Sequence, residues 1–343
     1  MVKPTGDKGY IAEEALRGYF RSAGYFAVRG IPLTYRKFDV TDVDLWLYLK
    51  TSTLTADRTC VDIKSKRTPQ AMERVLWTRG LKEILRVDRA IVVTPDNRPE
   101  TRDFGTAHGV GIMQGDFLHL AIATFPPTGR LTEEEFYSII NTACIVDSKI
   151  EWRSWFKRLK SRLLDSLNFD GCNKFLVQTR LLLDEYLASS KSSVASVRLL
   201  YIAIAYFLIC LDYTSRSFVH LDLSVRASIL TNGFRYGEGG RQRTDDVVQM
   251  ATLVLAEAGK ADFLSAETLR IEFEKQTSDY PAEILGEYFA KGESLKSLFG
   301  IARNFEEHAY AKTLLLPHEI SSEQKAILGL ICDFFRCDRK AII

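Results

Sequence analysis

The feature that most constrains the fold is a change in hydrophobic periodicity near residue 128, just after Pro126 and Pro127. Before this point, short apolar runs of strand length alternate with amphipathic helical stretches, which is typical of α/β domains. After it, apolar residues recur at helical spacing as far as the C-terminus. A chain of 343 residues is long enough for two hydrophobic cores. We therefore expect an α/β domain over residues 1–128 and an all-helical domain over residues 129–343.

The first domain is expected to form a small mixed central sheet flanked by helices. Gly24 ends the first expected helix and Pro69 begins the second. The expected helices are 9–23, 69–87 and 99–108. The expected strands are 25–28, 40–49, 59–65, 90–94 and 111–113, of which 40–49 and 59–65 form a hairpin.

The second domain is expected to consist of helices joined by short polar segments. Acid-rich first turns, which suit the helix dipole, mark several of their starts. The expected helices are 131–144, 148–166, 173–189, 194–213, 221–231, 244–258, 265–276, 281–290, 293–310 and 321–336. The segment 232–243 is rich in glycine and arginine and matches no phosphate-binding loop, so we interpret it as a flexible connector.

Composition indicates a soluble protein of a reducing compartment, and we expect a cytoplasmic location without membrane insertion. The six cysteines form no C-x-x-C pair and have no histidine at metal-ligand spacing. The longest apolar run, 199–211, is shorter than the roughly 20 residues needed to span a bilayer, so it predicts a buried helix. Residues 1–125 carry 19 Lys and Arg against 15 Asp and Glu, an excess that permits nucleic-acid binding without requiring it.

The motif with the clearest chemical content is Val61-Asp62-Ile63-Lys64. Alternation along a strand places Asp62 and Lys64 on one face and their apolar neighbours on the other. A second carboxylate, Asp44, lies in the preceding strand of the hairpin. Two carboxylates with a lysine beside them suit a hard divalent cation next to a phosphate.

The pattern leaves some alternatives open. Asp42 is two residues from Asp44 on the same expected face and is an alternative to it, and Asp39 is a weaker one. In the first helix Glu14 is an alternative to Glu13. Glu13 precedes Leu16 by three residues, so helical periodicity places Glu13 toward the core.

A helix bearing Glu13, Asp44 in a hydrophobic strand and Asp62-Ile63-Lys64 in the next strand together resemble the PD-(D/E)xK nuclease superfamily. This superfamily has the restriction-endonuclease-like fold of Mrr-like restriction enzymes and archaeal Holliday-junction resolvases. The resemblance extends over residues 9–120 and does not include the helical remainder. The chain departs from the family pattern in having Val43 where proline often precedes the first aspartate, and in having aspartate in the D-x-K half-motif.

The resemblance implies a role for each site residue. Asp44 and Asp62 would be metal ligands, the backbone carbonyl of Ile63 a further ligand, and Glu13 an additional ligand or the group that orients a metal-bound water. Lys64 would position or deprotonate the attacking water and neutralise transition-state charge. The implied cofactor is Mg²⁺, with Mn²⁺ able to replace it.

Two basic segments are candidates for nucleic-acid contact. Lys66, Arg67 and Gln70 follow the lysine and either approach the phosphates of the scissile strand or form a solvated loop and helix cap. Arg74 and Arg79, further along the same helix, are interpreted as surface or structural residues. The helix 148–163 interleaves basic and apolar residues, and we favour a core-packed helix with a solvated basic face.

These patterns predict a metal-dependent endonuclease that hydrolyses phosphodiester bonds, with DNA favoured over RNA as the substrate. The helical domain would place the substrate, bind a protein partner or form a homo-oligomer. The alternative is a non-catalytic nuclease-like subunit that binds nucleic acid or protein within a larger defence, repair or mobile-element complex. The joint presence of Asp44, Asp62 and Lys64 favours the enzyme, because a binding relic need not keep all three.

Overall fold

The computed structural model describes residues 8–36, 38–64, 70–126, 129–142, 151–165, 167–188, 194–257, 268, 271–272, 275 and 281–343. The chain divides into two compact units. The first comprises Met1–Asp165, Ser193–Leu199 and Glu306–Leu314, and the second comprises Ser166–Ser192, Leu200–Phe305 and Leu315–Ile343. The α/β unit therefore extends beyond the expected boundary at residue 128, as far as Asp165.

The first unit is built on a mixed sheet with the strand order β1-β2-β3-β4-β5. Its strands are β1 (Phe26–Tyr35), β2 (Phe38–Lys50), β3 (Ala56–Ile63), β4 (Arg89–Thr94) and β5 (Gly111–Gln114). β2 pairs antiparallel with both β1 and β3, whereas β4 pairs parallel with both β3 and β5. The expected mixed sheet is confirmed, as is the hairpin between the second and third strands.

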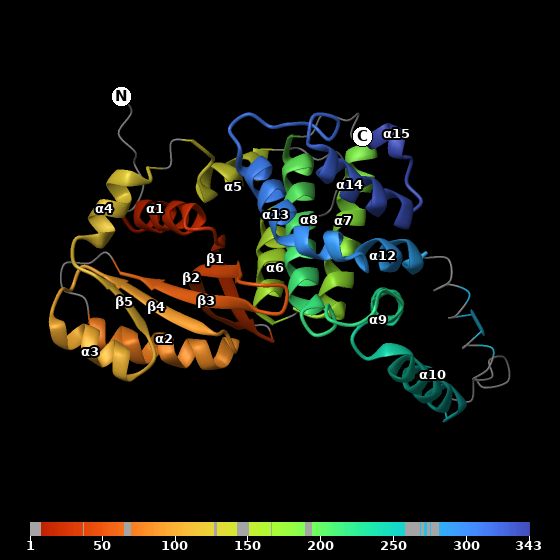
Figure 1. The fold of residues 1–343 in the computed structure, drawn as a ribbon, viewed down its shortest axis with the longest axis horizontal. Coiled ribbons are helices and arrows are strands. Elements are labelled where there is room, and N and C mark those ends of the chain that lie inside the picture. The colour runs from red at the N-terminus through yellow and green to blue at the C-terminus, as the bar shows by residue number, and fades with distance from the viewer. Residues whose placement is uncertain are drawn as a thin grey trace. The chain divides into compact units, whose positions relative to one another are not determined.

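Helices cover both faces of this sheet (Figure 1). On one face lie α1 (Lys8–Ser22) and α4 (Phe117–Thr124), and on the other lie α2 (Ala71–Leu85) and α3 (Pro99–Ala107). The last two form the crossovers that parallel strands require. The sequence did not predict α4, because a short apolar run does not distinguish a strand from a helix.

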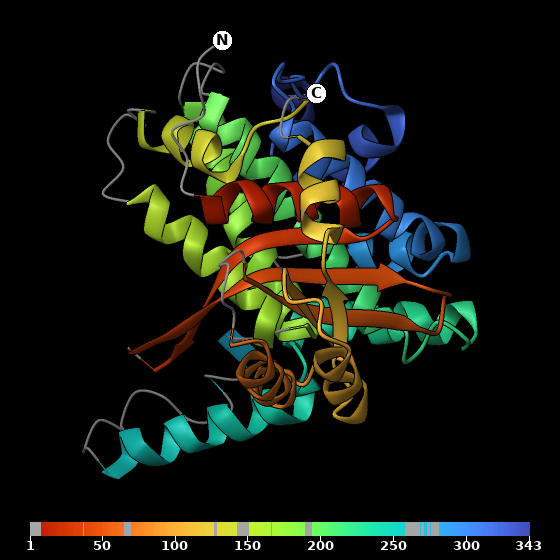
Figure 2. The ribbon, with the colours of Figure 1, turned by 90° about the vertical axis from the view of Figure 1, so that its left-hand side faces the viewer.

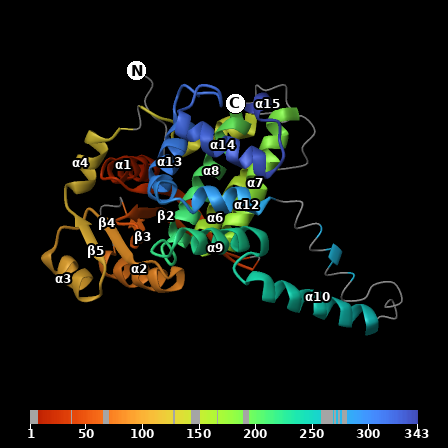
Figure 3. The ribbon, with the colours of Figure 1, turned by 45° about the vertical axis from the view of Figure 1, so that its right-hand side comes forward.

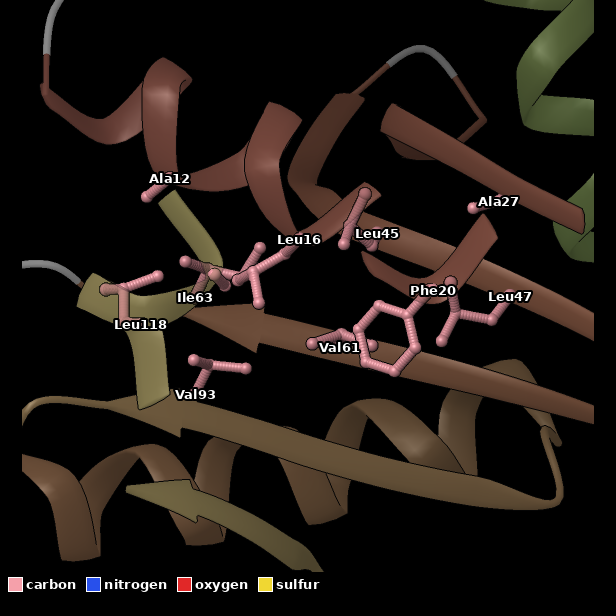
Figure 4. Packing of buried hydrophobic residues seen from close by; sticks show 11 residues of the cluster. Ala12, Leu16, Phe20, Ala27, Leu45, Leu47, Val61, Ile63, Val93 and Leu118 are labelled. Carbon is pink, nitrogen blue, oxygen red and sulfur yellow. The ribbon is translucent and has the colours of Figure 1, made fainter. Parts of the chain in front are cut away.

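The hydrophobic core lies between the sheet and α1 (Figure 4). Ala12, Leu16 and Phe20 follow one face of α1 at spacings of four residues, so their side chains point together at the strands. The strands supply every second residue to the same core, as the pleat requires. These strand residues are Ala27, Leu45, Leu47, Val61, Ile63 and Val93.

β1 is longer than expected, and the hairpin that it forms with β2 runs out past the other strands (Figure 2). β1 was predicted only over 25–28 because Gly30 and Pro32 weaken a strand pattern. Both are tolerated, because β1 is the edge strand of the sheet. At the tip Tyr35 pairs with Phe38, and both rings are exposed.

Two further helices, α5 (Glu133–Thr142) and α6 (Trp152–Asp165), belong to this unit through ion pairs rather than through the sheet alone. Lys160 of α6 donates to the Glu133 carboxylate at 2.7 Å and to the carbonyl of Arg29 in β1 at 2.9 Å. Arg29 in turn pairs with Glu134 at 2.7 Å. These contacts connect α5 and α6 to β1 within the same compact unit.

A second part of the same ion network surrounds Glu306, in the last turns of α13 (Gly292–Tyr310). Its carboxylate is buried and accepts hydrogen bonds from Arg17 at 3.0 Å and from Arg130 at 2.6 Å. Arg21 lies 3.4 Å from the same carboxylate. Burial alone would raise the pKa of Glu306, but the three arginines outweigh it and lower the pKa to about 2.

The second unit is mainly helical, and α8 and α13 contribute residues to both units. Its other helices are α7 (Phe169–Ala188), α9 (Leu223–Tyr236), α10 (Gly240–Glu257), α12 (Ala282–Phe289), α14 (Ser322–Phe334) and α15 (Arg339–Ile342), with α8 spanning Val194–Ser215. Within this unit α10 extends away from the other helices (Figure 3). The expected helix 265–276 lies largely outside the described residues.

The prediction of a flexible connector over 232–243 was wrong. α9 continues to Tyr236 and α10 begins at Gly240, so only three residues separate the two helices. Gly233 lies inside α9 where the ring of Phe169 packs, and a Cβ built there would be 2.3 Å from a ring carbon. This glycine therefore permits a close side-chain approach instead of marking a loop.

One helix, α8, is long and apolar enough to cross a membrane by length and composition. In its most apolar window 94% is buried inside the protein, as in the core helix of a soluble protein. The expectation of a buried helix at this position is therefore confirmed.

Candidate active site

Asp44 and Asp62 lie opposite each other on adjacent antiparallel strands. Leu45 of β2 pairs with Val61 of β3, and one residue further along this register Asp44 stands opposite Asp62. The Asp44 carboxylate reaches across to β3, where it accepts the backbone N–H of Ile63 at 2.7 Å. The hairpin therefore brings these two predicted carboxylates together.

The alternation expected for the motif is present in the structure. Val61 and Ile63 point into the core beneath α1, so Asp62 projects from the opposite face, which α2 covers. The Nζ atom of Lys64 lies 3.7 Å from Oδ1 of Asp62. The Asp62 side chain is only 7% exposed, whereas that of Lys64 is 32% exposed.

The electrostatics of Asp44 reflect this arrangement. Burial raises the pKa of its carboxyl group to about 7, although the Ile63 N–H and Lys64 act in the opposite direction. The negative charges of Asp62 and Glu13 raise that pKa further. A divalent cation would offset the negative charge of two such neighbouring carboxylates.

The structure distinguishes Asp44 from the alternative Asp42. Asp42 is exposed and, together with Asp39, lines a groove between β2 and α6. The basic side of that groove is formed by Lys157 and Arg158. Asp44, by contrast, is the aspartate of β2 that lies beside Asp62.

The two glutamates of α1 have different surroundings, and neither lies free beside the aspartates. Glu14 is buried and accepts hydrogen bonds from Arg29 at 2.9 Å and from the backbone N–H of Glu133 at 2.9 Å. Glu13 is more exposed than Glu14, contrary to the helical periodicity argument, and pairs with Arg29 at 2.7 Å. Burial raises the pKa of Glu13.

The remaining predicted site residues are Ile63, Gln70, Lys66 and Arg67. The side chain of Ile63 packs in the core and its N–H is taken by Asp44, which leaves its carbonyl as a possible ligand. Gln70 is exposed just before α2, and its side chain makes no capping hydrogen bond. Lys66 and Arg67 lie outside the described residues.

Sequence reasoning missed Arg74, which the structure places on Asp62. Its Nε atom donates to Oδ2 of Asp62 at 2.9 Å, and its Nη2 atom pairs with Oδ1. Arg74 lies three residues after Ala71 and four before Thr78, both of which are buried residues of α2. This spacing puts Arg74 on the inward side of the helix. It is the sequence signal from which Arg74 could have been identified as a site residue.

The donor set fits a magnesium ion. In the described part of the chain, no group of three or more Asp, Glu, His or Cys side chains is arranged to hold a metal. Asp44 and Asp62 are thus a pair, without Glu13 as a third ligand. Magnesium suits such a pair, since it commonly takes one or two carboxylates and completes its octahedron with water and substrate phosphate.

Comparison of the chain with protein-family models, with curated proteins and with solved structures finds no match.

Proposed function

We propose that this chain is a divalent-metal-dependent endonuclease of the PD-(D/E)xK type that hydrolyses phosphodiester bonds in DNA. The observation that carries the proposal is the pairing of Asp44 and Asp62 across the β2–β3 hairpin, with Lys64 on the same side. The order α1-β1-β2-β3-α2-β4-α3-β5 supports a restriction-endonuclease-like fold for the first unit.

In this function each side chain has a chemical task. A bound Mg²⁺ supplies an activated water at neutral pH and offsets charge on the phosphoryl oxygens. Asp44 and Asp62 supply its carboxylate ligands, and Asp44 is oriented by the N–H of Ile63. Lys64 keeps its ammonium near Asp62 and toward the solvent side, where it stabilises charge that grows in the transition state.

The cysteines are consistent with a cytoplasmic enzyme. Cys172 and Cys210 approach to 3.5 Å between their sulfur atoms and carry free thiols. Cys60 and Cys332 are also free and buried. Free thiols in such proximity suit the reducing compartment that we propose for this protein.

The test is a cleavage assay on supercoiled plasmid, linear duplex, single-stranded DNA and RNA, with Mg²⁺, Mn²⁺ or a chelator. We expect cleavage of DNA only when the metal is present. Lys64→Met should lower the rate about 10²-fold, because it removes the ammonium that stabilises the transition state. Lys82→Met, on α2, is the matched control and should leave the rate unchanged. Equal rates for the two variants contradict the role of Lys64.

A second candidate function, a nucleic-acid-binding subunit without catalysis, is favoured by the groove between β2 and α6. Lys157 and Arg158 lie on its helical side, and both side chains are exposed. Arg162 lines the same groove, and burial together with the neighbouring Arg158 lowers its pKa. Such a cluster of cations attracts a phosphate backbone.

Binding of duplex DNA in the presence of a chelator measures this contribution apart from cleavage. The double variant Lys157→Glu, Arg158→Glu should weaken binding and reduce the slope of log K against log salt by about 2, as expected for two lost phosphate contacts. Arg153→Glu, on the same helix but outside the groove, is the control. Salt-dependent binding combined with no cleavage in any metal would favour the binding subunit over the nuclease.

A further inference from the structure

The guanidinium of Arg74 occupies the carboxylate that the proposed metal requires. Arg74 uses two nitrogen atoms to contact both oxygen atoms of Asp62, the forked geometry in which arginine binds carboxylates most strongly. Burial alone would lower the pKa of Arg74, but Asp62 and then Asp44 outweigh it and raise that pKa. Arg74 is therefore a cation that offsets the negative charge of Asp62.

A divalent cation and Arg74 compete for the same oxygen atoms. An oxygen ligand of Mg²⁺ lies about 2.1 Å from the ion, so the guanidinium cannot stay in its forked contact when the ion binds Asp62. The charge balance of the site also favours the release of Arg74 from Asp62 when the ion binds. With the two aspartates balanced by the ion, Lys64 and Arg74 leave two positive charges beside the site, and the single negative charge of a phosphodiester would offset one of them.

Arg74 has room to leave Asp62. Its side chain is 24% exposed, in contrast to the nearly enclosed Asp62. The ring of Trp77, one turn along α2, lies 5.5 Å from the guanidinium carbon and is itself exposed. A rotation of the long side chain toward Trp77 would keep a cation–π contact while it frees Asp62.

We propose that Arg74 is a substrate-binding residue that exchanges partners: it holds Asp62 until a divalent cation displaces it, and then binds a non-bridging oxygen of the scissile phosphate. The inference rests on the proposed function for the identity of the phosphate. The competition itself concerns only Arg74, Asp62 and the metal. Metal binding and DNA binding are thereby coupled, because the ion releases the group that contacts the substrate.

The first experiment measures binding of Mn²⁺ alone to the intact protein by electron paramagnetic resonance. Arg74→Met should bind Mn²⁺ about tenfold more tightly than the wild type, since removal of the guanidinium ends the competition. Arg74→Lys, which keeps the charge without the fork, should lie between the two. Arg79→Met is the matched control on the exposed side of α2, and thermal melting checks that each variant is folded.

The second experiment measures binding of a duplex oligonucleotide by fluorescence anisotropy in Ca²⁺, with single-turnover cleavage in Mg²⁺ alongside. Arg74→Met should lose about tenfold in DNA affinity although it gains in metal affinity. This pair of opposite changes is not expected of a residue that only supports the fold, which would lower both affinities.

The outcomes separate this inference from the proposed function. Equal or weaker Mn²⁺ binding in Arg74→Met overturns the exchange of partners, while metal-dependent cleavage by the wild type can still stand. Tighter Mn²⁺ binding by Arg74→Met, with no cleavage by any variant, supports the competition between Arg74 and the metal for Asp62. The same result contradicts the proposed nuclease function. Absence of Mn²⁺ binding in both the wild type and Arg74→Met overturns both.

Discussion

Replacing Asp44 with asparagine is expected to lower metal-dependent DNA cleavage by about 10²-fold or more. Loss of an outer partner of a metal ligand commonly costs 10–100-fold, so loss of a ligand should cost at least as much. The amide keeps the shape of the side chain, and its oxygen can still accept the N–H of Ile63. Single-turnover cleavage and Mn²⁺ binding should fall together.

The neighbouring aspartate gives a matched control for this prediction. Asp42→Asn changes the same atoms two residues away on β2, where the carboxylate is exposed. It should retain the activity of the wild type. Because the pKa of the half-buried Asp44 carboxyl group is raised, its replacement by a neutral group should not unfold the protein. If Asp42→Asn abolishes cleavage and Asp44→Asn does not, the site has been assigned to the wrong aspartate.

Replacing Glu306 with glutamine is expected to lower the free energy of unfolding by about 3–5 kcal/mol. The carboxylate is shared by Arg17, Arg21 and Arg130. Its loss removes the carboxylate that Arg130 contacts at 2.6 Å and one of the carboxylates around the buried Arg17. Urea denaturation at pH 7 measures the effect. Glu307→Gln is the matched control, since Glu307 is 67% exposed and lies 3.9 Å from Arg21, and it should cost less than about 1 kcal/mol.

The same glutamate predicts a dependence of stability on pH. The pKa of Glu306 is about 2 in the folded protein, below the ordinary value of 4.5, so its stabilising contribution is present above pH 4.5. That contribution decreases as the pH falls from 4.5 toward 2, because protonation removes the charge that the arginines bind. The difference in stability between the wild type and Glu306→Gln should narrow over this range. A difference that stays constant would mean that Glu306 acts through packing instead of charge.

Much of the fold could be predicted from hydrophobic periodicity, because the repeat of a strand or a helix is present within the sequence of that single element. The run 40–49 lies within β2, and the helix 9–23 differs from α1 by one residue at each end. The run 59–65 overlaps β3 over residues 59–63. The predictions that failed concern element boundaries at which the local sequence signal is ambiguous. Gly30 and Pro32 hid the length of β1, and Gly233 suggested a loop where an aromatic ring packs against a helix.

The sequence by itself determined the mixed sheet, the helical remainder and the placement of Asp62 and Lys64 on one strand face, because these depend on spacing along a single element. Only the tertiary structure decided which side chains of other elements lie beside Asp62 and Lys64. The strand register placed Asp44 rather than Asp42 beside Asp62, since a shift of one residue reverses every side chain. Packing of α2 on the sheet brought Arg74 onto Asp62, and the buried ion network joined α5 and α6 to the first unit. These pairings depend on distances between segments far apart in the chain, which no local pattern records.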